Sequence, residues 1–259
     1  MSAYAKGGPL HNPQVDLLPY PLRSTVLGGR EKVRKQAGFT LIEIAIVLVI
    51  IGLLLGGVLK GQELITSARV RNLISQQEGV KAAYFGFLDR FRSLPGDYGR
   101  ATTNIAGATV NGNSNGQITA ATVAGATEDE YIAVWEHLSK AGFINGSYTY
   151  NESPEISSSV PTNPYVRYIR VIYDAVYGTG GGAARHNIKT GNQIPSDIMA
   201  EIDRKMDDGN PVGGVFQFST YDGGGTGGTA STGGAAGQCY VGTAWTAPSV
   251  TNCGGASLL

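Results

Sequence analysis

The sequence predicts an α+β fold, in which one long N-terminal helix precedes a head of short helices and strands. Residues 39–59 are almost entirely apolar, and apolar side chains recur at spacings of three and four through residues 60–93. The residues after 94 alternate between short helix-like and strand-like segments with many turn signals. The chain of 259 residues is long enough for one medium domain in addition to such a helix.

The segment 39–59, FTLIEIAIVLVIIGLLLGGVL, has the length of a membrane-spanning helix. At 1.5 Å per residue it would extend about 31 Å, which matches the apolar thickness of a bilayer. The first 38 residues carry six Lys and Arg against two Asp and Glu. The positive-inside rule therefore predicts a cytoplasmic N-terminus and a head on the other side of the membrane.

The helix is predicted to continue beyond the membrane as far as about Arg92. Leu94-Pro-Gly-Asp97 then ends it, because Pro95 and Gly96 suit the two central positions of a type II turn. Four segments follow from this: 1–38 as a cytoplasmic leader, 39–59 as the transmembrane half of the helix, 60–93 as its amphipathic half, and 94–259 as the globular head.

Short elements are predicted within the head. Thr127-Glu-Asp-Glu130 has the pattern of a capping box, which would start a helix that ends at Gly142. The other predicted elements are a loop over 101–126, a strand over 165–177, a helix over 195–206, a strand over 215–221 and a glycine-rich loop over 222–237.

The chain has two cysteines, Cys239 and Cys253, both far beyond the membrane segment. A head outside the cytoplasm lies in an oxidising compartment, so the pair can form a disulfide. Such a bond would close a loop of about 15 residues and contribute about 3 kcal/mol. The alternative is two free or intermolecular thiols, and two sulfur ligands alone do not make a structural zinc site.

Glu43 lies five residues into the apolar run, where an ionised carboxylate is costly unless it is paired or near the interface. It could snorkel to the cytoplasmic boundary of a simple membrane anchor. It could instead pair with a positive group, and the α-amino group made by a cleavage before Phe39 would supply one.

The residues around Glu43 resemble the cleavage and methylation signature of type IV prepilins and type II secretion pseudopilins. Lys35-Gln-Ala-Gly38 and then Phe39-Thr-Leu-Ile-Glu43 form a basic leader ending in Gly, followed by Phe and by Glu at the fifth mature position. The resemblance implies that a prepilin peptidase cuts between Gly38 and Phe39 and methylates the Phe39 amine. It also implies that Glu43 pairs with the Phe39 amine of a neighbouring subunit.

The leader and the head extend this resemblance. A leader of 38 residues is long for the family, and initiation near Val33 would give one of the usual length. Leu94-Pro-Gly-Asp97, WEHLSKAG at 135–142 and IDRKMDDG at 202–209 resemble a subgroup of prepilin-like proteins in Gram-negative bacteria. This subgroup resemblance implies a type IV pilin-like fold, with a small antiparallel sheet laid on the long helix.

The function implied by the resemblance is that of a major or minor pilin, which polymerises into a type IV pilus. Its partners would be prepilin peptidase, an inner-membrane assembly platform and other pilin copies in a helical filament. The subunit would cross the inner membrane once, with a periplasmic head, before it enters a cell-surface pilus. One alternative is a pseudopilin in a periplasmic pseudopilus of type II secretion. An alternative of another class is a membrane-tethered periplasmic binding module that neither is cleaved nor polymerises.

No catalytic pattern is recognisable in the sequence. Its histidines, His11, His137 and His186, lie in different contexts, and no nucleophile elbow is present. We therefore predict no enzyme activity and no required cofactor. The chain after residue 38 has 14 basic and 18 acidic residues, which gives no indication of nucleic-acid binding.

Four side chains are a weaker candidate for a calcium site. Asp203, Asp207, Asp208 and Asn210 group oxygen ligands around a predicted helix end and a glycine turn. Their spacing is not that of an EF-hand loop. The alternative is a solvated acidic turn.

Overall fold

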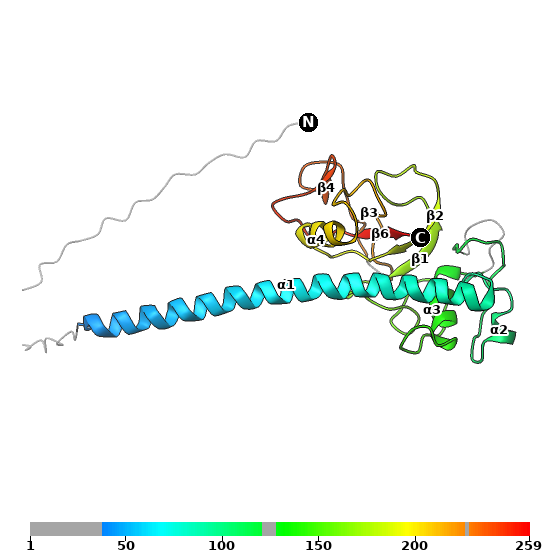
Figure 1. The fold of residues 1–259 in the computed structure, drawn as a ribbon, viewed down its shortest axis with the longest axis horizontal. Helices are drawn as coiled ribbons and strands as arrows, with labels where there is room; N and C mark the ends of the chain where they lie inside the picture. The colour runs from blue at the N-terminus through cyan, green and yellow to red at the C-terminus, as the bar shows by residue number, and fades with distance from the viewer. Residues whose placement is uncertain (1–37, 121–127, 226–227) are drawn as a thin grey trace, which may run out of the picture. The chain divides into compact units, whose positions relative to one another are not determined.

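The structure, a computed structural model, describes residues 38–120, 128–225 and 228–259 (Figure 1). The chain divides into two units, one ending at Ile51 and one running from Gly52 to Leu259, so that the boundary lies within the first helix. The described elements in chain order are α1 (Leu41–Phe91), α2 (Ala101–Asn104), α3 (Glu130–Lys140), β1 (Arg170–Asp174), β2 (Arg185–Lys189), α4 (Ser196–Met206), β3 (Phe216–Phe218), β4 (Tyr240–Val241), β5 (Ala244–Trp245) and β6 (Gly255–Leu258).

The long N-terminal helix and the α+β class are confirmed. Helix α1 ends at Phe91, one residue before the predicted end. Among the described residues, α1 is long and apolar enough to cross a membrane, and none of its most apolar 18-residue window is buried. The predicted short helices are also present, as α3 and α4.

The head contains a four-stranded antiparallel sheet in the order β1-β2-β6-β3. The predicted strand over 165–177 is shorter in the structure, because residues 163–167 close a tight turn before β1 begins. The predicted strand over 215–221 likewise reduces to β3. Strands β2 and β6 were not predicted, and β6 is buried along its whole length although its sequence, Gly-Ala-Ser-Leu, has low strand propensity.

One face of α1 is buried by the head in the second unit. The buried residues recur at spacings of three and four, as expected for one face of a helix. They are Val70, Leu73, Gln77, Val80, Ala83, Tyr84 and Phe87. The C-terminal part of this face, from Val80 to Phe87, belongs to a core with α3 and β1. Its N-terminal part, with Val70 and Leu73, belongs to a second core with α4, β3 and the C-terminal segment.

The turn after α1 docks onto α3 through a buried histidine. The Gly96 N–H donates to His137 Nδ1 at 2.9 Å, and His137 Nε2 lies 3.0 Å from the Val110 carbonyl oxygen. Gly96 has φ +88°, as the predicted type II turn requires, and a Cβ there would lie 2.5 Å from the Glu130 carbonyl oxygen. Only glycine therefore fits this position.

The predicted capping box at the start of α3 is wrong in the position of its N-cap. The N-cap is Asp129, which makes no side-chain cap hydrogen bond, and Thr127 lies outside the described residues. The Glu130 carboxylate instead accepts the backbone N–H groups of Asn113 and Thr119, both at 3.0 Å. Glu130 thus makes a tertiary contact with the preceding loop, which the sequence did not predict.

We expect Gly96→Ala to lower the free energy of unfolding by about 3 kcal/mol, because it adds left-handed strain and a clash with the Glu130 carbonyl. Gly116→Ala is the matched control, since Gly116 has φ +81° but a Cβ there meets no atom within 4 Å. The control should lower the free energy of unfolding only by the backbone strain, about 1 kcal/mol. Urea unfolding of the full chain in detergent, followed by tryptophan fluorescence, measures both, and equal losses would contradict the docking role.

Candidate functional site

The residues predicted to be cut lie just before α1. Gly38 and Phe39 are both exposed and precede the first helical residue, Leu41. The Phe39 side chain is 83% exposed. The peptide bond between Gly38 and Phe39 therefore lies outside regular structure.

Glu43 forms a reciprocal cap with Thr40 at the start of α1. The Glu43 Oε2 atom accepts the Thr40 backbone N–H at 2.8 Å and the Thr40 hydroxyl at 2.9 Å. The Glu43 backbone N–H donates in turn to Thr40 Oγ1 at 3.3 Å. This is a capping box, which satisfies two N-terminal donors of the helix. The role of Thr40 was not predicted, although the Thr-x-x-Glu spacing was visible in the sequence.

The cap holds the Glu43 carboxylate in the first turn of α1, next to the predicted new N-terminus. The N–H group that the carboxylate accepts belongs to Thr40, the residue immediately after Phe39. A carboxylate in the first helical turn interacts favourably with the helix dipole, whereas an ammonium group there does not. Glu43 can therefore offset a positive charge placed on Phe39.

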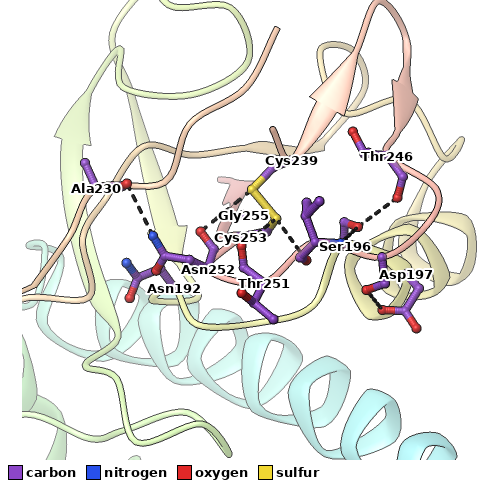
Figure 2. Close-up of a disulfide and its surroundings, with 12 residues drawn as sticks. Asn192, Ser196, Asp197, Ala230, Cys239, Thr246, Thr251, Asn252, Cys253 and Gly255 are labelled. Carbon is purple, nitrogen blue, oxygen red and sulfur yellow. Dashed lines mark hydrogen bonds between the residues drawn. A yellow bond between two sulfur atoms is a disulfide. The ribbon is translucent and has the colours of Figure 1, made fainter. Parts of the chain in front are cut away.

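The two cysteines form the predicted disulfide, Cys239–Cys253, with Cα atoms 5.5 Å apart. Both are buried, and Figure 2 shows the bond beside the start of α4. Cys253 exchanges two backbone hydrogen bonds with Ile194, at 2.9 and 3.1 Å. The disulfide is thus attached directly to the segment that leads into α4.

The loop closed by the disulfide lies along α4 and is joined to it at several points. Ser196 Oγ donates to the Thr246 carbonyl at 2.8 Å and accepts the Val250 N–H at 3.0 Å (Figure 2). Further along α4, Trp245 Nε1 donates to the buried Asp203 carboxylate at 2.7 Å. The loop is therefore a packed part of the head.

Three of the four calcium candidates come together at the end of α4. Asp203, Asp207 and Asp208 each place a carboxylate oxygen within 4.8 Å of the others. Asp203 is buried, and this burial raises its pKa, with a further contribution from the charges of Asp208 and Asp207. The fourth candidate, Asn210, uses its side-chain oxygen to accept the Val212 N–H at 3.1 Å.

Comparisons with known proteins add one finding to this geometry. A family model described as the prokaryotic N-terminal methylation motif matches residues 33–59. The matched segment includes Gly38, Phe39, Thr40 and Glu43, the residues at the start of α1. A search of curated proteins and a search of solved structures found no match to the chain.

Proposed function

We propose that this chain, whose N-terminal segment carries the methylation motif of prepilins and pseudopilins, is a structural subunit of a type IV pilus, as a major or minor pilin. Prepilin peptidase cuts it between Gly38 and Phe39 and methylates the new amine. The mature chain then passes from the inner membrane, through the assembly platform, into a filament of pilin copies.

The observation that carries this proposal is the match of the methylation motif to residues 33–59. Glu43 lies within this segment, in the first turn of a helix whose most apolar part is not buried. In a bundle of such helices, an ionised Glu43 without a positive partner would be a buried, uncompensated charge and would destabilise the assembly. The Phe39 amine of a neighbouring copy offers the opposite charge. A new subunit would then settle at the register that pairs the two groups.

The C-terminal disulfide loop favours a pilus over a secretion pseudopilus within this family. The 221 residues after Gly38 comprise the long helix and a sizeable head, and the disulfide loop is hydrogen-bonded along α4 rather than free. Such a loop suits a subunit whose head must endure outside the cell. A simple tethered binding module would need neither cleavage at Gly38 nor a carboxylate at position 43.

Intact-mass and N-terminal analysis of the membrane-extracted protein tests the processing step. In a host with prepilin peptidase, we expect a chain that begins at N-methylated Phe39. In a host that lacks the peptidase, the leader should remain. A chain that stays uncut in both hosts would overturn the proposal and favour the tethered module.

We expect Glu43→Gln to be cleaved normally but to assemble poorly. Glutamine keeps an oxygen for the Thr40 cap and removes the charge that pairs with the neighbouring amine. Loss of one partner of a buried ion pair costs about 3–5 kcal/mol, so sheared filament yield should fall by about a hundredfold or more. Glu63→Gln is the control, because Glu63 forms an exposed pair with Lys60 on the same helix. Equal filament yields from the two variants would refute the role of Glu43.

As a secondary part of the proposal, the Asp203, Asp207 and Asp208 carboxylates bind Ca²⁺, which would offset their mutual repulsion. We expect millimolar Ca²⁺ to raise the Tm of the full chain in detergent. It should also change the fluorescence of Trp245, whose indole N–H donates a hydrogen bond to Asp203. Asp208→Asn, at an exposed position, should remove the Tm shift. The same Tm in Ca²⁺ and in EDTA would contradict calcium binding and show that these residues form a solvated acidic turn.

A further inference from the structure

The chain contains three Asn-Gly pairs, all in the head: Asn111-Gly112, Asn115-Gly116 and Asn145-Gly146. In such a pair, the backbone nitrogen of the glycine can attack the side-chain carbonyl carbon of the asparagine, because glycine has no side chain to hinder the approach. The attack requires an asparagine side chain that can rotate and a glycine N–H that no acceptor holds. The three pairs share the same two residues, so the structure decides which of them can react.

Hydrogen bonds hold both reacting groups of the first pair. The Asn111 side-chain oxygen accepts the Thr102 N–H at 2.9 Å and the Thr102 hydroxyl at 3.1 Å. The Gly112 N–H donates to the Tyr98 carbonyl at 3.0 Å. Gly112 is also packed so closely that a Cβ there would lie 2.2 Å from the Gly96 carbonyl oxygen. The first pair can therefore react only after these contacts are broken.

The second pair is held in a similar way, with a carboxylate as one of the acceptors. The Asn115 side-chain oxygen accepts the Gln117 N–H at 2.8 Å. The Gly116 N–H donates to the buried Asp97 carboxylate at 2.9 Å, and the Asn115 N–H donates to the same carboxylate at 2.9 Å. Hydrogen bonds to an ionised group are stronger than those to a carbonyl, so the glycine nitrogen is held firmly.

The third pair lacks these restraints. Among the described residues, the Asn145 side chain and the Gly146 N–H have no hydrogen-bond partner. Both residues are exposed, in the turn that follows α3. Gly146 has φ +102°, and Asn145 lies on the wall of a hollow of about 430 Å³, so water reaches the pair. This pair therefore has the freedom of movement that the other two pairs lack.

We propose that Asn145 is a site of spontaneous covalent modification, in which its side-chain amide becomes a carboxylate. The Gly146 nitrogen forms a bond to Asn145 Cγ, and the bond from Cγ to Nδ2 breaks. Ammonia leaves and carries away the proton of the Gly146 N–H. The resulting cyclic imide then takes up a water molecule and opens to aspartate or to isoaspartate. No atom is oxidised or reduced, and water is the only co-reactant.

The modification adds one negative charge to the surface of the head. Because Asn145 lines the hollow, the new carboxylate lies on the wall of that hollow. The reaction needs only a folded head in water, so this inference does not depend on the proposed function. In the proposed filament, older subunits would carry the charge and newly added subunits would not.

Incubation of the purified full chain in detergent at mildly alkaline pH tests the site. Trypsin places Asn145 in the peptide 141–167 and the other two asparagines in the peptide 101–140. We expect Asn145 to be converted faster than Asn111 or Asn115 by about tenfold or more, because each of those must first lose at least two hydrogen bonds. Mass spectrometry of the fragmented peptides measures each rate, and heavy-oxygen water labels the new carboxyl group.

Two controls separate the effect of the structure from that of the sequence. In guanidinium chloride, which unfolds the head, the three pairs should react at similar rates. Asn145→Gln should keep the Tm of the folded chain and remain unmodified at this position, because glutamine would have to form a larger ring. Equal rates at the three pairs in the folded chain would overturn the inference. It would also be overturned if Asn145 stayed unchanged in the folded chain over a period in which it reacts in guanidinium chloride.

Discussion

The hydrogen bonds of the His137 imidazole join the three segments that meet at the end of α1. Nδ1 accepts from Gly96 in the turn after α1, so the proton is on Nε2, which donates to Val110. Burial lowers the pKa of His137, and this favours the neutral ring that such a pair of bonds requires. Without this ring, the Gly96 N–H and the Val110 carbonyl would be left without their buried partner.

Two buried carboxylates then shape the loop that the histidine holds in place. Asp97 accepts the N–H groups of Asn115 and Gly116, both at 2.9 Å, and Glu130 accepts those of Asn113 and Thr119. Burial raises the pKa of both carboxyl groups, while these N–H bonds oppose that shift. A loop with few apolar residues is therefore ordered by side chains that come from the turn and from α3.

The sequence predicted those elements whose cause is local, and it failed where the cause is a contact between distant segments. The apolar period predicted α1, and the proline-glycine turn predicted its end, because both depend on neighbouring residues. The contacts of Glu130 were not predicted because its partners, Asn113 and Thr119, come from an earlier loop. Strand β6 was missed because its place between β2 and β3, rather than its composition, makes it a strand. At the candidate site, the local Thr40 cap was within reach of sequence analysis, whereas the contact of Trp245 with Asp203 was not.

The proposed contact of Glu43 with a neighbouring copy constrains one degree of freedom of a filament. Pairing of Glu43 with a neighbouring Phe39 amine limits how far one helix slides along another, but a single point contact leaves rotation about it free. A second contact between copies is needed to remove that rotation. A subunit that has to form one regular helical filament therefore needs further contacts in addition to the charge pair in the apolar helix.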